Sequence, residues 1–244
     1  MILYVNGDSH SVGHGTASQY GMTINDPIYS DIDEAPHPAN LPLSYGAVLA
    51  QQKNWNLVCQ AKSGGSLDRA IRTTKQFVYQ TMGDLFVLIG VPSFEREEWL
   101  HNGVWYQINS GGHEVLPNDL QERYKKWVIE KDNAAGWWDQ QSVIHDKLYA
   151  FHQWLNNHNV KHLFFNTAQP FTNRTRAGKR YDTYNWDEQY FEPYGPSESL
   201  GVFCNWCLSQ GFTHDIWGHF SRDAHQAWAE NLLPSLDRIM KQYD

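Results

Sequence analysis

The sequence predicts an α/β fold with a mostly parallel central sheet. Short apolar runs at 2–6 (ILYVN), 56–60, 84–90 (DLFVLIG) and 161–166 have the length and composition of buried strands. Segments with helical periodicity lie between them, and this alternation is typical of parallel strands joined by right-handed crossovers. The 244 residues are 41% hydrophobic, which suffices for one sizeable core, so we expect a single domain over 1–244.

The helices between and after these strands are expected from apolar periodicity and capping residues. They are predicted at 44–53, in 63–82 with Ser66 as N-cap, in 118–133 with Asn118 as cap, at 138–157, at 197–210 and at 223–243. Loop excursions are expected at about 91–136 and 169–196. Within the first of these, VWYQINSGG (104–112) has the pattern of a hairpin arm that ends in a Gly-Gly turn.

Composition excludes several classes of protein. The net charge of −8 at pH 7 argues against a general nucleic-acid binder, which needs a basic face. No stretch approaches the ~18 apolar residues of a membrane span, and the first residues lack the basic region of a signal peptide. We therefore expect no membrane partner and a cytoplasmic location, although a virus-encoded protein would fit equally well.

The cysteines and histidines do not predict a metal site. An odd count of three cysteines argues against a disulfide framework. Cys204 and Cys207 share one face of a predicted helix, where core packing is the simpler interpretation than zinc or redox chemistry. The twelve histidines include no His-Glu-x-x-His pattern, so no metal and no cofactor is expected.

Residues suited to catalysis follow the predicted strands. Gly7-Asp8-Ser9-His10 follows the first strand, Ser63-Gly64-Gly65 the second and Gly90-Val91-Pro92-Ser93 the third. Ligands bind outside the carboxyl ends of parallel strands, so these turns are expected to meet at one edge. Asp215 and His219 precede the last helix, and a serine, a histidine and an aspartate beside glycine-turn amides are what acyl transfer requires.

These stretches resemble the sequence blocks of the SGNH (GDSL-type) hydrolases. GDSHS resembles the first block, AKSGGS the second, and DIWGHFSRDAHQAWAENL the fifth, while LIGVPS occupies the place of the third. They span residues 5 to 230 in the family's order. The resemblance implies a flavodoxin-like three-layer α/β/α fold. It also implies hydrolysis of acyl esters, often on carbohydrates or lipids.

The resemblance assigns roles to individual residues. Ser9 takes the position of the nucleophile, His219 that of the base and Asp215 that of the acid. The oxyanion donors would be the amides of Ser9 and Gly64, with Ser93 as a further candidate. His10 and Asp8 lie near enough in sequence to contact the substrate, although Asp8 also suits bracing of the turn.

Two positions depart from the family pattern. The third block usually carries Gly-x-Asn, whose asparagine is an oxyanion donor, but here Pro92, which has no donor, follows Gly90-Val91. The acid usually precedes the histidine by three residues, a position held here by Ile216. Asp215 is one residue further away. Both departures bear on catalytic efficiency more than on the fold.

The sequence therefore favours a serine esterase that acts on a small-molecule or glycan acyl ester. Two alternatives stay open: a binding or structural module with little catalysis, and an acyltransferase that uses the same triad. The basic and aromatic segment 173–196 is open to two interpretations in the same way. It could bind an anionic or sugar-like substrate by stacking and charge. Alternatively, it could be a surface loop whose aromatic side chains pack it against the body of the protein.

Overall fold

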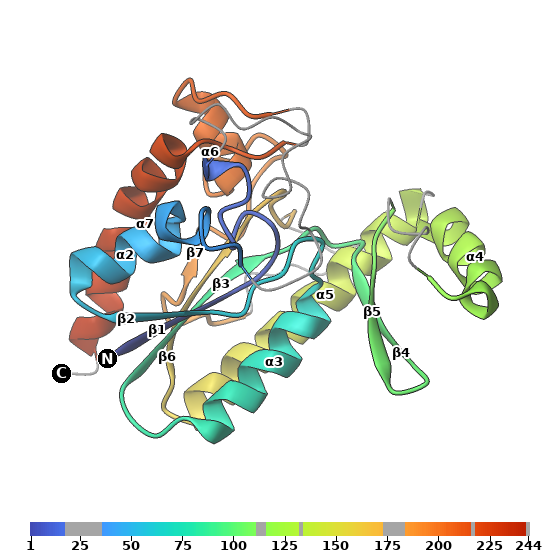
Figure 1. Cartoon of the computed structure of the whole chain (residues 1–244), viewed down its shortest axis with the longest axis horizontal. Coiled ribbons are helices and arrows are strands. Elements are labelled where there is room, and N and C mark those ends of the chain that lie inside the picture. Colours follow the sequence, from blue (N-terminus) through green and yellow to red (C-terminus); the bar gives the residue numbers. More distant parts are fainter. Residues whose placement is uncertain (18–35, 111–115, 132–133, 173–183, 216–217, 243–244) are drawn as a thin grey trace.

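The central sheet has five parallel strands. The computed structural model describes residues 1–17, 36–110, 116–131, 134–172, 184–215 and 218–242. The strands lie in the order β2-β1-β3-β6-β7 (Figure 1). Their bounds are β1 Ile2–Asn6, β2 Asn56–Cys59, β3 Leu85–Val91, β6 Lys161–Asn166 and β7 Tyr190–Phe191. Without β4 and β5 this is the flavodoxin-like order, which changes direction between β1 and β3.

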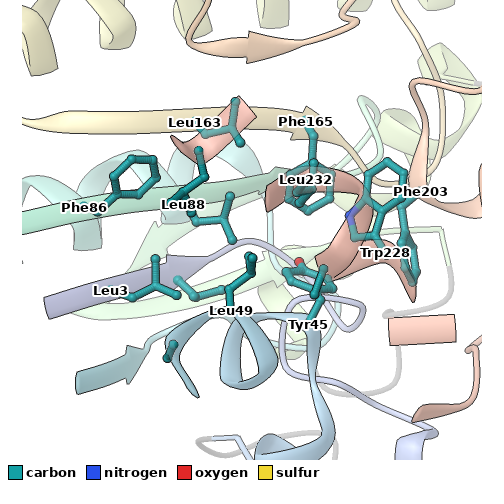
Figure 2. Close-up of a cluster of buried hydrophobic side chains, with 14 of the residues drawn as sticks. Leu3, Tyr45, Leu49, Phe86, Leu88, Leu163, Phe165, Phe203, Trp228 and Leu232 are labelled. Carbon is teal, nitrogen blue, oxygen red and sulfur yellow. The ribbon is translucent and has the colours of Figure 1, made fainter. Parts of the chain in front are cut away.

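Two layers of helices cover the sheet, and this confirms the predicted three-layer α/β/α class (Figure 1). On one face pack α2 (Tyr45–Lys53) and α7 (Arg222–Gln242), and on the other α3 (Leu67–Gln80) and α5 (Ala134–Asn157). Figure 2 shows the first core, where Leu3, Leu88 and Phe165 of the strands meet helix residues such as Leu49 and Trp228. β1, β3 and β6 are buried on both faces because helices cover each side, so their sequences are continuous apolar runs.

A hairpin interrupts the crossover that follows β3. β4 (Glu97–His101) pairs antiparallel with β5 (Val104–Ile108), and α4 (Gln121–Lys131) packs beside them over a small separate core (Figure 1). Asn102 and Gly103 turn the chain with φ of 49° and 80°, the two positive values that a type I′ turn needs. A hairpin arm beginning at residue 104 was predicted with its turn at the end of the arm. In the structure the turn, Asn102-Gly103, comes before the arm. The predicted turn at Gly111-Gly112 lies outside the described residues.

Other differences from the prediction are local. Ser66 caps α3 as expected, since its side chain accepts the Arg69 amide. Asn118 is not a cap: it begins the short 3₁₀ segment Asn118–Leu120, with Pro117 at the N-cap position. α6 (Phe203–Ser209) is shorter than the helix predicted at 197–210, and the excursion 169–196 contains β7. Residues 173–183 of that excursion lie outside the described part of the chain.

Within the described part of the chain, the structure contains no helix with both the length and the apolar character of a membrane span.

Candidate active site

The turn after β1 carries Ser9 at the point where the strand order reverses. Gly7 has a φ of 140°, and a side chain there would collide with the Gly90 carbonyl of β3. A backbone hydrogen bond closes the turn: the His14 amide donates to the Ser9 carbonyl (3.0 Å). Ser9 is 5% exposed. The serine is thus held at the carboxyl edge between β1 and β3, where ligands bind in this class of fold.

Asp8 ties this turn to two neighbouring strands. One carboxylate oxygen, Oδ1, accepts the His10 amide (3.1 Å). The other, Oδ2, accepts the Thr167 hydroxyl (3.0 Å) and the Arg96 guanidinium (3.3 Å). Thr167 follows β6 and Arg96 follows β3, and Asp8 is 1% exposed. Both oxygens are therefore engaged by protein groups, which fixes the turn relative to the sheet.

Asp215 and His219 belong to a tight loop before α7. The Asp215 carboxylate accepts the His219 amide (2.9 Å), and the Asp215 amide donates to the His219 carbonyl (3.0 Å). The other carboxylate oxygen lies 3.6 Å from Nδ1 of the His219 ring. The carboxylate thus approaches the histidine ring to ion-pair distance across the longer sequence spacing, but Nδ1 forms no hydrogen bond with it. Ile216 lies outside the described residues.

His14 joins the serine turn to this loop. Its amide binds the Ser9 carbonyl, and its ring lies 4.4 Å from the His219 ring, centroid to centroid, at an angle of 32°. A Cβ on Gly15 would lie 2.8 Å from Cβ of His219, so the backbones of the two segments are in close contact. Residues from opposite ends of the chain, Ser9 and His219, are in this way parts of one packed unit.

His10 forms the third ring of this cluster. Its centroid lies 5.5 Å from that of His219, and its Nε2 lies 3.5 Å from the Cys204 sulfur. Burial raises the pKa of the Cys204 thiol to about 12, so the group that meets Nε2 is the neutral thiol. Burial lowers the pKa of His10 to about 4, and that of His14 likewise to about 4. Both rings are therefore neutral at pH 7, and the buried Nδ1 of His10 has no hydrogen-bond partner.

The turn after β2 packs directly on the serine turn. The Lys62 amide donates to the Gly7 carbonyl (3.2 Å), and a Cβ on Gly65 would lie 2.8 Å from that same oxygen. Gly64 has a φ of 68°, which favours glycine. A Cβ built on Gly64 would lie 3.1 Å from the side-chain nitrogen of Asn109. The hairpin therefore brings an amide side chain to the candidate oxyanion turn.

Asn109 was missed by the sequence analysis. It follows β5 directly, and the Asn102-Gly103 turn is the signal that could have shown β5 returning toward the sheet. Ser93, the predicted candidate, lies in the turn after β3, where its carbonyl accepts the Arg96 amide (3.3 Å). Both positions lie beyond strand ends, and of the two it is Asn109 whose side chain approaches Gly64.

Comparison with known proteins gives structural likeness alone. No family model and no curated protein matches the sequence. A solved structure of a protein of the G-D-S-L family from Desulfitobacterium hafniense DCB-2 is similar over 98% of both chains, at 10% identity and a TM-score of 0.38. The psychrotrophic esterase EstA from Pseudoalteromonas sp., inhibited by monoethylphosphonate, is similar over 98% of both chains, at 11% identity and a TM-score of 0.44. The roles of individual residues rest on the geometry of this chain.

Proposed function

We propose that this protein is a serine hydrolase of acyl esters, with Ser9 as nucleophile, His219 as base and Asp215 as the acid that orients the base. The observation that carries the proposal is His14, which binds the Ser9 carbonyl through its amide and contacts the His219 ring with its own ring. A hydroxyl needs a neighbouring base, and the base needs an orienting carboxylate. The loop of Asp215 and His219 supplies both groups beside the serine turn.

The reaction follows from these roles. Ser9 Oγ attacks the carbonyl carbon of the ester, and its proton passes to His219. The imidazolium is stabilised by the Asp215 carboxylate, 3.6 Å from Nδ1. When the tetrahedral intermediate collapses, the ester C–O bond breaks and His219 protonates the departing alcohol. Water, deprotonated by His219, then releases the acid and restores Ser9.

The charge on the intermediate needs donors that are already in place. We assign this role to the amides of Ser9 and Gly64 and to the Asn109 side chain. The approach of Asn109 to Gly64 supports its inclusion, and it provides a side-chain donor that Pro92 cannot. Ser93 is a further candidate at the same edge.

Two residues near the serine have different assignments. Asp8 is a positioning residue, because both of its oxygens bind protein groups and it is buried. His10 is a candidate substrate contact, since its buried Nδ1 has no hydrogen-bond partner in the protein. The chemistry assigned to these side chains requires no cofactor. A small acyl ester fits it, and an acetyl ester of a carbohydrate is the finer proposal.

Hydrolysis of p-nitrophenyl acetate and labelling by a fluorophosphonate test the proposal together. We expect both in the wild type and neither in Ser9→Ala. Ser209→Ala, which removes an exposed hydroxyl from α6, is the matched control and should behave as wild type. A folded wild type that is neither labelled nor active would contradict the nucleophile and favour a binding module. Product analysis with an added alcohol then distinguishes hydrolysis from acyl transfer.

A further inference from the structure

A cavity with a largely apolar surface, lined also by charged and amide side chains, lies on the α3/α5 side of the molecule, next to the serine turn. Its volume is 350 Å³, within the range of small-molecule sites. Its lining is Asp68, Phe94, Arg96, Glu97, Glu130, Lys131, Gln140, Val143, Ile144 and Lys147. Arg96 connects it to the candidate active site, because Nη1 of the same guanidinium binds the Asp8 carboxylate at 3.3 Å.

Gln140 is the unusual residue of this lining. It is 7% exposed, yet neither its amide nitrogen nor its amide oxygen has a hydrogen-bond partner. The next residue, Gln141, shows the ordinary arrangement: its oxygen accepts both the amide and the hydroxyl of Thr172. A buried amide without partners costs free energy, so its retention calls for a ligand that satisfies it. Nε of Arg96 is a second buried donor without a hydrogen-bond partner, although Oε1 of Glu95 lies 3.9 Å from it.

The charges of the lining argue against an anionic ligand. The lining contains three basic and three acidic side chains. Lys147 binds Asp68 at 2.7 Å and Lys131 binds Glu97 at 2.8 Å, so two of the cations are already neutralised within the wall. Arg96 also lies against the carboxylates of Asp8 and Glu95, so an anion would meet only cations that are already paired. Hydroxyl groups need only the free donors and acceptor.

We propose that this cavity binds the vicinal hydroxyls of a neutral sugar unit. One hydroxyl donates to the Gln140 oxygen, and its neighbour accepts from the Gln140 nitrogen. Nε of Arg96 donates to a further oxygen, and Ile144 and Val143 contact the apolar C–H face of the ring. As a subsite for the alcohol part of the ester, this role rests on the proposed function, while the binding itself does not.

The test measures binding in the Ser9→Ala background, so that it does not depend on hydrolysis. Methyl glucoside and glucuronate are titrated as probes and followed by calorimetry. We expect saturable binding of methyl glucoside and at least tenfold weaker binding of glucuronate. Adding Gln140→Leu should weaken methyl glucoside binding by roughly tenfold or more, the value of two hydrogen bonds. Gln226→Leu, an exposed glutamine on α7, is the matched control and should leave binding unchanged.

A second readout separates a ligand site from a merely structural glutamine. Without sugar, Gln140→Leu should raise Tm by about 2–4 °C, because it removes a buried amide that forms no bond. A fall in Tm would show that Gln140 stabilises the fold and would overturn the proposal. No saturable sugar binding, or binding that Gln140→Leu leaves intact, would also overturn it. Loss of activity in Ser9→Ala alone bears only on the proposed function.

Discussion

Glu98 of β4 anchors the hairpin that carries Asn109 to the candidate oxyanion site. Its carboxylate accepts two hydrogen bonds from Arg72 of α3, at 2.7 and 2.8 Å, and one from Gln107 of β5, at 2.7 Å. The Gln107 oxygen in turn accepts the Ser66 amide at the start of α3 (3.2 Å). The Glu98 side chain is 1% exposed. Replacing it with alanine therefore removes the contact through which strand, helix and turn are joined.

The size of the effect follows from burial. Removing one partner of a buried ion pair costs about 3–5 kcal/mol. Arg72 retains 27% exposure, so water solvates part of its charge, and we expect a cost slightly below this range, about 2–3 kcal/mol. For a chain of this size that corresponds to a fall in Tm of about 4–12 °C. Because Asn109 follows β5, we also expect kcat to fall in the variant that remains folded.

Thermal unfolding and esterase kinetics of Glu98→Ala, measured below its Tm, give both quantities. The control is Glu122→Ala, which breaks an exposed pair with Lys125 and should change neither Tm nor kcat measurably. A Glu98→Ala protein as stable as wild type would refute the argument from burial. A destabilised variant with unchanged kcat would refute the link between the hairpin and catalysis.

Three further predictions concern the site. Asn109→Ala should lower kcat about 10²–10³-fold with little change in KM or Tm, as for loss of one oxyanion donor, and wild-type kcat would remove Asn109 from the mechanism. Asp215→Asn should lower kcat by up to about 10⁴-fold while fluorophosphonate labelling slows in parallel; an unchanged rate would leave a Ser9–His219 dyad. Burial lowers the pKa of His10 to about 4 and that of His225 to about 3. As the pH falls below 6.5, both histidines therefore become protonated in the unfolded chain while they stay neutral in the folded chain. Stability should thus be greatest above pH 6.5 and fall toward pH 4, by at most about 1.4 kcal/mol per pH unit for each histidine, and urea midpoints that stay flat over this range would contradict it.

Strands buried on both faces were predictable because such burial requires a continuous run of apolar residues, which the sequence shows directly. β1 and β3 are continuous apolar runs bounded by polar residues, and Ser66 lies where a cap is needed before α3. β4 has no such apolar run. Its sequence EEWLH contains two glutamates, and the buried Glu98 carboxylate is held by Arg72 and Gln107. Local hydrophobicity could not reveal a strand held by an ion pair.

Some residues of the candidate site could likewise be predicted from the sequence, and others could not. Ser9 and Gly64 could be placed from sequence because each directly follows a recognisable strand. Asn109 and Arg96 could not, since their positions depend on the register of the hairpin and on a carboxylate, that of Asp8, far away in the sequence. The approach of Asp215 to His219 likewise depends on loop backbone bonds that spacing does not determine.

The ring contact between His14 and His219 joins two segments that are far apart in the chain, and this has a consequence for folding kinetics. Contacts between remote segments carry a high cost in loop closure and form slowly. The last loop can dock only when α7 has packed onto the sheet that β1 helped to build. During refolding, the return of esterase activity should therefore lag behind the return of helical structure and report the completion of the fold.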